Sequence, residues 1–177
     1  ISIEDLKSLS KKDVDGNLVP LTKTINTKNE TPVSIYSKVA SQPYSFLFES
    51  VEGGEKIARY SFIGVKPYEI IKTGVGQTHG AVDPLKLIEQ RLNNRKVIKQ
   101  FKSNRFDGGA VGYASYETAS YFEDLPTAKQ DALNLPESVF MFFNTYIMFD
   151  HIDNRISIVS HVNLNDDIET SYAEAVD

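Results

Sequence analysis

Two short segments place the strongest constraint on the fold of this chain. In the first, residues 45–51 and 58–64 combine aromatic and β-branched side chains, and Gly53 and Gly54 lie between them. This composition predicts two strands joined by a reversal that the glycines permit. In the second, residues 108–113 are mostly small. They predict a buried strand whose backbone packs closely against a neighbouring layer.

Helices are predicted where a capping side chain precedes a proline, at Thr31 with Pro32 and at Asp83 with Pro84. Threonine and aspartate accept hydrogen bonds from free amides of the first turn, and proline at the first helical position loses no bond. Further helices are expected over residues 115–123 and from residue 165 onward. The residues expected to share one face of each periodic helix are Val33, Tyr36 and Val39 or Ala40, then Leu85, Ile88 and Leu92, and finally Ile168, Tyr172 and Val176.

The remaining strands are expected at residues 67–73 and in a hairpin of residues 140–150 and 155–162, which turns around residues 151–154. The strands follow one another in meanders with helices interspersed, and they do not alternate regularly with helices. This order predicts an α+β fold of antiparallel sheet layers with a few amphipathic helices. The absence of a stop signal after the last helix suggests that the chain is cut from something longer.

The composition excludes several classes of protein. With 177 residues, 41% of them hydrophobic, the chain suits one compact domain, or one large lobe cut from something bigger, with an ordinary core. No apolar run reaches the roughly 20 residues that span a bilayer, and the first seven residues lack the basic-then-apolar layout of a signal peptide, so a soluble protein is expected. The absence of cysteine excludes disulfides and fits the cytoplasm. A net charge of −5 argues against nucleic-acid binding, and the basic residues within 91–105 are interpreted as a solvated surface or a contact with a partner subunit.

The sequence offers no catalytic or metal-binding constellation. His79, His151 and His161 are scattered, without a second ligand at metal spacing. The glycines of 108–112 lack the lysine that ends a phosphate-binding loop, which leaves close backbone packing as their ordinary use. We therefore assign no catalytic residue and no metal ligand.

Glu49 and Ser50 form the polar pair with the clearest binding potential. A carboxylate and a hydroxyl at the end of a strand can hold an ammonium group, and Arg59, across the predicted reversal, can meet a carboxylate. Together they would match the two charged groups of an amino acid. The alternative is a surface strand with an ion pair inside the hairpin, and spacing alone leaves both open.

The two segments, 46–50 with 59–64 and then 106–117, resemble the N-terminal half of the large subunit of anthranilate synthase. The similarity runs through 121–123 and the hairpin and covers most of the chain from about Thr31 onward. In that family the first segment forms one side of the inhibitory tryptophan pocket. The resemblance implies that Phe48, Glu49, Ser50 and Arg59, together with Pro32, contribute half of this feedback site. Phe48 stands where leucine is common, which would narrow the pocket.

The family converts chorismate and ammonia, or glutamine, to anthranilate and pyruvate in tryptophan biosynthesis. The resemblance implies Mg²⁺ held by a C-terminal chorismate-binding region, a glutamine amidotransferase subunit as partner and L-tryptophan as inhibitor. None of the motifs of that catalytic region occurs here. Residues 1–177 are therefore interpreted as the N-terminal domain alone, inactive by itself. The alternatives are the same region of aminodeoxychorismate synthase component I, or a stand-alone amino-acid-binding regulatory module.

Overall fold

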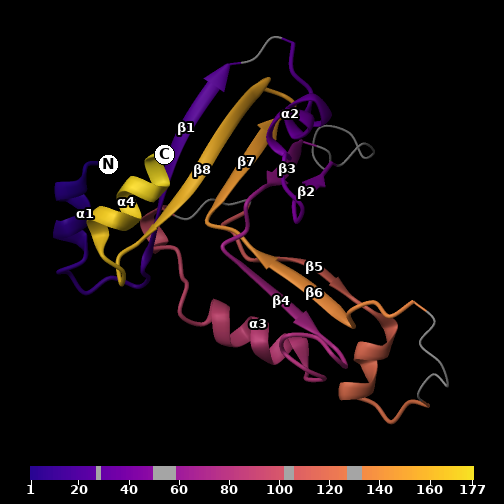
Figure 1. Ribbon diagram of the computed structural model, residues 1–177. Helices are drawn as coiled ribbons and strands as arrows, with labels where there is room; N and C mark the ends of the chain where they lie inside the picture. The colour runs from indigo at the N-terminus through magenta and orange to yellow at the C-terminus, as the bar shows by residue number, and fades with distance from the viewer. Residues whose placement is uncertain (27–28, 50–58, 102–105, 127–132) are drawn as a thin grey trace. The chain divides into compact units, whose positions relative to one another are not determined.

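The computed structural model describes residues 1–26, 29–49, 59–101, 106–126 and 133–177 (Figure 1). The chain divides into two compact units. Unit 1 comprises Ile1–Pro67, Arg95–Gly108 and Phe143–Asp177, and unit 2 comprises Tyr68–Asn94 and Gly109–Phe142. Ser50 and the predicted reversal at Gly53 and Gly54 lie outside the described residues.

Unit 1 is built on a five-stranded antiparallel sheet with the strand order β1-β8-β7-β3-β2 (Figure 1). Within the predicted strands at 45–51 and 58–64, the described residues form β2 and β3, with Phe48 opposite Phe62. The strands of this sheet are β1 (Leu18–Asn26), β2 (Phe46–Phe48), β3 (Tyr60–Gly64), β7 (Thr145–Asp150) and β8 (Arg155–Asn163).

Helices α1 (Ile3–Leu9), α2 (Pro32–Val39) and α4 (Ile168–Val176) cover one face of this sheet. The strand register places the sheet residues of both core clusters on that face, because opposite residues of antiparallel strands point to the same side. A short 3-10 helix, η1 (Lys99–Phe101), also belongs to unit 1. One cluster contains Leu6, Val19, Ile98 and Val162, and the other contains Ile35, Ile63, Phe149 and Ile156.

The opposite face of the sheet is rich in aromatic side chains. Cross-strand pairing places Phe48 beside Phe62, and Phe62 beside Met148. Phe106 lies against this surface, with its ring centroid 5.0 Å from those of Phe62 and Tyr146. We call this surface the aromatic face, and its members on the strands are Phe46, Phe48, Tyr60, Phe62, Tyr146 and Met148.

Unit 2 contains a three-stranded antiparallel sheet with the order β4-β6-β5, formed by β4 (Glu69–Thr73), β6 (Ser138–Phe142) and β5 (Ala110–Ala114). Helix α3 (Pro84–Leu92) is attached to β4 by the Arg91–Glu69 ion pair, with an Nε–Oε1 distance of 2.8 Å. Between β4 and β6, Thr73 and Ser138 share a buried hydroxyl contact of 2.6 Å. The fold class predicted from the sequence, antiparallel sheets with a few helices, is confirmed.

Several predicted details are wrong. Residues 140–150 do not form one strand, because β6 ends at Phe142 in one sheet and β7 begins at Thr145 in the other. The helix expected over residues 115–123 is present as a shorter 3-10 helix, η2 (Tyr116–Tyr121). The predicted buried strand at 108–113 becomes β5, where Val111 is buried but Gly112 and Tyr113 are exposed.

The faces of the helices also differ from the predicted ones. Val33 is exposed and Ile35 is buried in α2, because the first turn packs through Pro32 and Ile35. Leu85 is exposed on α3. In α4, Ile168 and Tyr172 pack as predicted, but Ala175 takes the place expected of Val176, which is exposed. Within the described ranges, no helix has the length and apolar character needed to cross a membrane.

Candidate functional site

The predicted site residues that the structure describes lie in unit 1, in α2, in and after strand β2 and just before β3. Pro32 is buried at the beginning of α2, where Thr31 accepts a hydrogen bond from the Ser34 amide. Phe48 ends β2 and is 54% exposed, although its ring centroid lies 4.9 Å from that of Phe46. Glu49 follows Phe48 and is exposed. Ser50 lies outside the described residues, so its place relative to the others stays a prediction.

Arg59 precedes β3 and binds two carboxylates of the β7–β8 hairpin. Its Nε donates to both carboxylate oxygens of Asp150 at 3.1 Å, and Nη2 donates to Asp150 Oδ2 at 2.7 Å. Nη2 also donates to Asp153 at 3.2 Å. The guanidinium carbon lies 5.0 Å from the centroid of the Tyr60 ring, within the range of a cation–π contact. The structure thus brings Arg59 to the edge of the aromatic face.

Asp150 is the main described partner of Arg59, and the sequence analysis did not identify it. Burial by itself raises the pKa of its carboxyl group. The hydrogen bonds from Arg59 and from the amides of Asp153 and Ile152 outweigh this effect, and the pKa lies below its ordinary value. Asp150 is therefore a charged carboxylate fixed between a guanidinium and a turn. Its only signal in the sequence was its place at the edge of the predicted turn.

A second polar contact joins the same strands on the helix-covered face. Ser61 is fully buried, and its hydroxyl lies 2.8 Å from His151 Nε2. The His151 ring packs on Phe149 with a centroid distance of 4.8 Å. The contacts of His151 thus hold the β7–β8 turn against strand β3. Burial lowers the pKa of His161, whose Nδ1 lies 3.1 Å from the Asn144 carbonyl oxygen.

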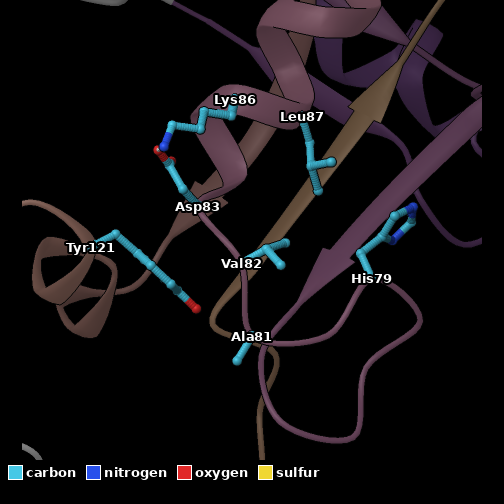
Figure 2. A pocket seen from close by; sticks show the side chains of 7 residues that line it. All are labelled: His79, Ala81, Val82, Asp83, Lys86, Leu87 and Tyr121. Atoms are coloured by element: carbon cyan, nitrogen blue, oxygen red, sulfur yellow. Dashed lines mark ion pairs between the residues drawn. The ribbon is translucent and has the colours of Figure 1, made fainter.

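Unit 2 carries a separate open hollow of about 460 Å³ (Figure 2). The Tyr121 hydroxyl donates to Glu137 at 2.8 Å, and burial together with this bond raises the pKa of Tyr121 to about 12. Lys86 and Asp83 face each other at its rim, 4.0 Å apart. The residues that line the hollow are His79, Ala81, Val82, Asp83, Lys86, Leu87 and Tyr121.

Metal ligands are not gathered in the described part of the chain, where no group of three or more histidine, cysteine, aspartate or glutamate side chains lies together. At Arg59, a guanidinium paired with Asp150 and Asp153 lies beside an aromatic surface on which Phe48 is exposed.

Comparison with known proteins identifies the family. A family profile described as "chorismate binding enzyme" matches residues 43–177, which include both characteristic segments. The chain belongs to this family. The resemblance to anthranilate synthase component I noted from the sequence is confirmed by its relatives. Anthranilate synthase component 1 of Acetivibrio thermocellus is 34% identical over 99% of this chain and 37% of its own length. The Saccharomyces cerevisiae protein of the same name is 35% identical over 97% of this chain and 35% of its length.

A solved structure shows the same fold. Anthranilate synthase component I from Streptococcus pneumoniae matches with a TM-score of 0.54 at 22% identity, over 86% of this chain and 36% of that chain. The chain therefore spans little more than a third of the length of the relatives that it matches.

Proposed function

We propose that this chain forms the N-terminal part of an anthranilate synthase component I and contributes half of a tryptophan feedback site. The observation that carries the proposal is the guanidinium of Arg59, held beside the aromatic face on which Phe48 is exposed. An aromatic amino acid has a carboxylate, an ammonium group and an apolar ring, and each has a partner of matching chemistry in this region.

In this proposal Arg59 meets the ligand carboxylate, because its planar fork of donors matches a carboxylate. Glu49, with Ser50, meets the ammonium group. Phe48 offers its exposed ring to the indole, and aromatic pairs of this kind gain about 0.5–1.5 kcal/mol beyond the burial of area. Pro32 fixes the start of α2, whose Ile35 packs beneath the sheet.

The parent enzyme in this proposal makes anthranilate and pyruvate from chorismate, with a glutamine amidotransferase subunit supplying ammonia. Its Mg²⁺ would be held by a catalytic region outside this chain. The described residues do not fit a metal site, because they bring no three suitable ligands together. We place the parent in the cytoplasm, which suits a chain without cysteine.

The purified chain is expected to produce no anthranilate from chorismate, ammonia and Mg²⁺, since a metal site and a general base must come from residues that it lacks. Anthranilate fluorescence measures the product. The Acetivibrio thermocellus relative, assayed in parallel, shows that the reagents are active. Turnover that follows the chain through repeated purification from a host lacking its own anthranilate synthase would refute the assignment of catalysis to another region.

Tryptophan is expected to bind the chain weakly. If the chain buries only about half of the 150–250 Å² of an aromatic ring, the binding free energy is about 2–3 kcal/mol less favourable at roughly 25 cal/mol per Å². Binding is then about fifty-fold weaker than at a complete site. The titration therefore extends to millimolar ligand and is followed by amide shifts in nuclear magnetic resonance (NMR) spectra. Because the chain contains no tryptophan, the fluorescence of the ligand, excited at a wavelength that tyrosine does not absorb, gives an independent signal.

Ser50→Phe is expected to abolish this binding by filling the pocket. Ser8→Phe, the same exchange at an exposed position of α1, is the matched control and should bind as the wild type does. If millimolar tryptophan causes no amide shifts in the spectrum of the wild-type chain, the proposed feedback site is refuted. Binding by the Ser50→Phe variant that is as tight as binding by the wild type would also argue against it.

A further inference from the structure

The ion pairs around Arg59 form a cluster at one end of the unit 1 sheet. Arg59 binds Asp150 through two donors and Asp153 through one, and Arg155 binds Asp153 from the other side. Two guanidinium groups therefore face two carboxylates. The Arg59 and Asp150 side chains are 29% and 12% exposed, so water screens their contact less than it screens a surface pair.

The strand register determines the side of the sheet on which this cluster lies. Asp150 is opposite Tyr60, as Met148 is opposite Phe62. Directly opposite residues of antiparallel strands point the same way, so the Asp150 carboxylate belongs to the aromatic face. The guanidinium of Arg59 lies on this side as well, against the Tyr60 ring. The carboxylate of Asp150 thus lies on the same side of the sheet as the Arg59 guanidinium that it binds.

Asp150 is itself fixed by the turn that follows it. Its Oδ1 accepts hydrogen bonds from the amides of Ile152 at 3.1 Å and Asp153 at 3.2 Å. The same carboxylate therefore orders the β7–β8 turn and holds the Nε and Nη2 edge of Arg59. Among the described residues, the hydrogen bonds of the Arg59 guanidinium use Nε and Nη2. A ligand carboxylate would therefore approach Nη1.

We infer that Asp150 is a positioning residue of the amino-acid site: it holds Arg59 against Tyr60 so that the Nη1 end of the guanidinium faces a ligand on the aromatic face. This inference rests on the proposed function and adds a residue from the distant β7–β8 hairpin to it. If Asp150 merely competed with the ligand for Arg59, its removal would strengthen binding. If it positions Arg59, its removal weakens binding.

Asp150→Asn separates these two effects. The amide oxygen of asparagine can still accept the two turn hydrogen bonds, while the charge and the second acceptor for Arg59 are lost. Tryptophan binding is expected to weaken about tenfold, the scale of one lost charge-assisted pair. In the free protein, the Arg59 Nε–H signal should exchange with water faster by about the same factor, which a general loss of packing at the turn would not produce selectively.

Three further variants complete the test. Asp150→Glu restores the carboxylate and should recover part of the binding. Asp153→Asn leaves both bonds to Asp150 intact and should weaken binding about twofold, so it tests the cluster even if Asp150→Asn does not fold. Glu69→Gln removes the carboxylate of the comparable Arg91 pair in unit 2 and should leave tryptophan binding unchanged.

The outcomes distinguish the inference from the function on which it rests. If the wild-type chain does not bind tryptophan, the proposed function fails and the inference fails with it. If the wild type binds and a folded Asp150→Asn variant binds equally or more tightly, the inference alone is overturned. The inference alone is also overturned if Asp153→Asn changes tryptophan binding no more than the control variant Glu69→Gln does.

Discussion

Gly112→Ala is expected to lower the free energy of unfolding by about 3 kcal/mol, at the upper end of the range for overpacking. A Cβ atom at this position would lie 1.8 Å from the carbonyl oxygen of Val139 and 2.8 Å from the Cα of Phe140. Both are backbone atoms and cannot rotate away. Strand β5 would have to move from β6, with which it pairs from Ala110 to Ala114. Urea denaturation followed by circular dichroism measures the loss.

Gly80→Ala is the matched control in the same unit. Gly80 has φ +68°, so alanine there incurs the left-handed backbone cost of about 1–2 kcal/mol, but a Cβ would meet no heavy atom within 4 Å. Gly112 does not have a positive φ, so a loss in Gly112→Ala that exceeds the loss in Gly80→Ala must come from the clash with β6. No loss of stability in Gly112→Ala would show that β5 adjusts freely and that the small residues of this strand serve another purpose.

The prediction of close packing at residues 108–113 was therefore half right. The sequence indicated that a neighbour approaches the glycines, and at Gly112 one does. The neighbour is the adjacent strand β6, however, and not a second layer. A glycine reveals that space is short around its Cα, but nothing local specifies which element occupies that space.

The helix starts could be predicted because capping is local chemistry. Thr31 accepts from Ser34, and Asp83 accepts from Leu85, both within the first turn. The buried faces of the same helices were less predictable. An apolar residue such as Val33 satisfies helical periodicity equally well whether it contacts the sheet or solvent, and the sheet contact goes to Ile35.

The hairpin shows the same limit for strands. Residues 140–150 are almost continuously apolar or aromatic, a pattern that a single buried strand also produces. The break between Phe142 and Thr145 arises because β6 pairs with β4 and β5, whereas β7 pairs with β3 and β8. This choice of partners depends on contacts distant in sequence, which periodicity does not report.

In the candidate site too, residues close together in the sequence could be predicted, whereas the residue distant in sequence could not. Phe48, Glu49 and Arg59 lie close together in the sequence, and the resemblance to a family drew attention to them. Asp150 lies 91 positions from Arg59, and the register that pairs Tyr60 with Asp150 brings them together. The sequence analysis left open an ion pair inside the first hairpin. The described contacts of Arg59 go instead to the β7–β8 hairpin.

Raising the pH from 10 to 12 is expected to remove about 2–3 kcal/mol of stability through Tyr146 alone. Burial, aided by the negative charge of Asp107, raises the pKa of Tyr146 to about 12, against an unfolded value near 10. Between these values the folded chain retains the phenolic proton and the unfolded chain releases it. Stability is therefore fully present below pH 10 and is lost as the pH rises through about 12, at roughly 1.4 kcal/mol for each pH unit in this window.

Tyr146→Phe tests the assignment, because phenylalanine keeps the ring contact with Phe106 and removes only the hydroxyl that donates to the Phe106 carbonyl at 2.7 Å. The variant should be less stable at neutral pH, since that carbonyl loses its donor. It should also lose less stability than the wild type between pH 10 and 12. The difference in tyrosinate absorbance between the two proteins reports the ionisation of Tyr146 directly. A difference that titrates near pH 10, or identical slopes of stability with pH, would show that water reaches this phenol and that the Phe106 segment does not seal the aromatic face over Tyr146.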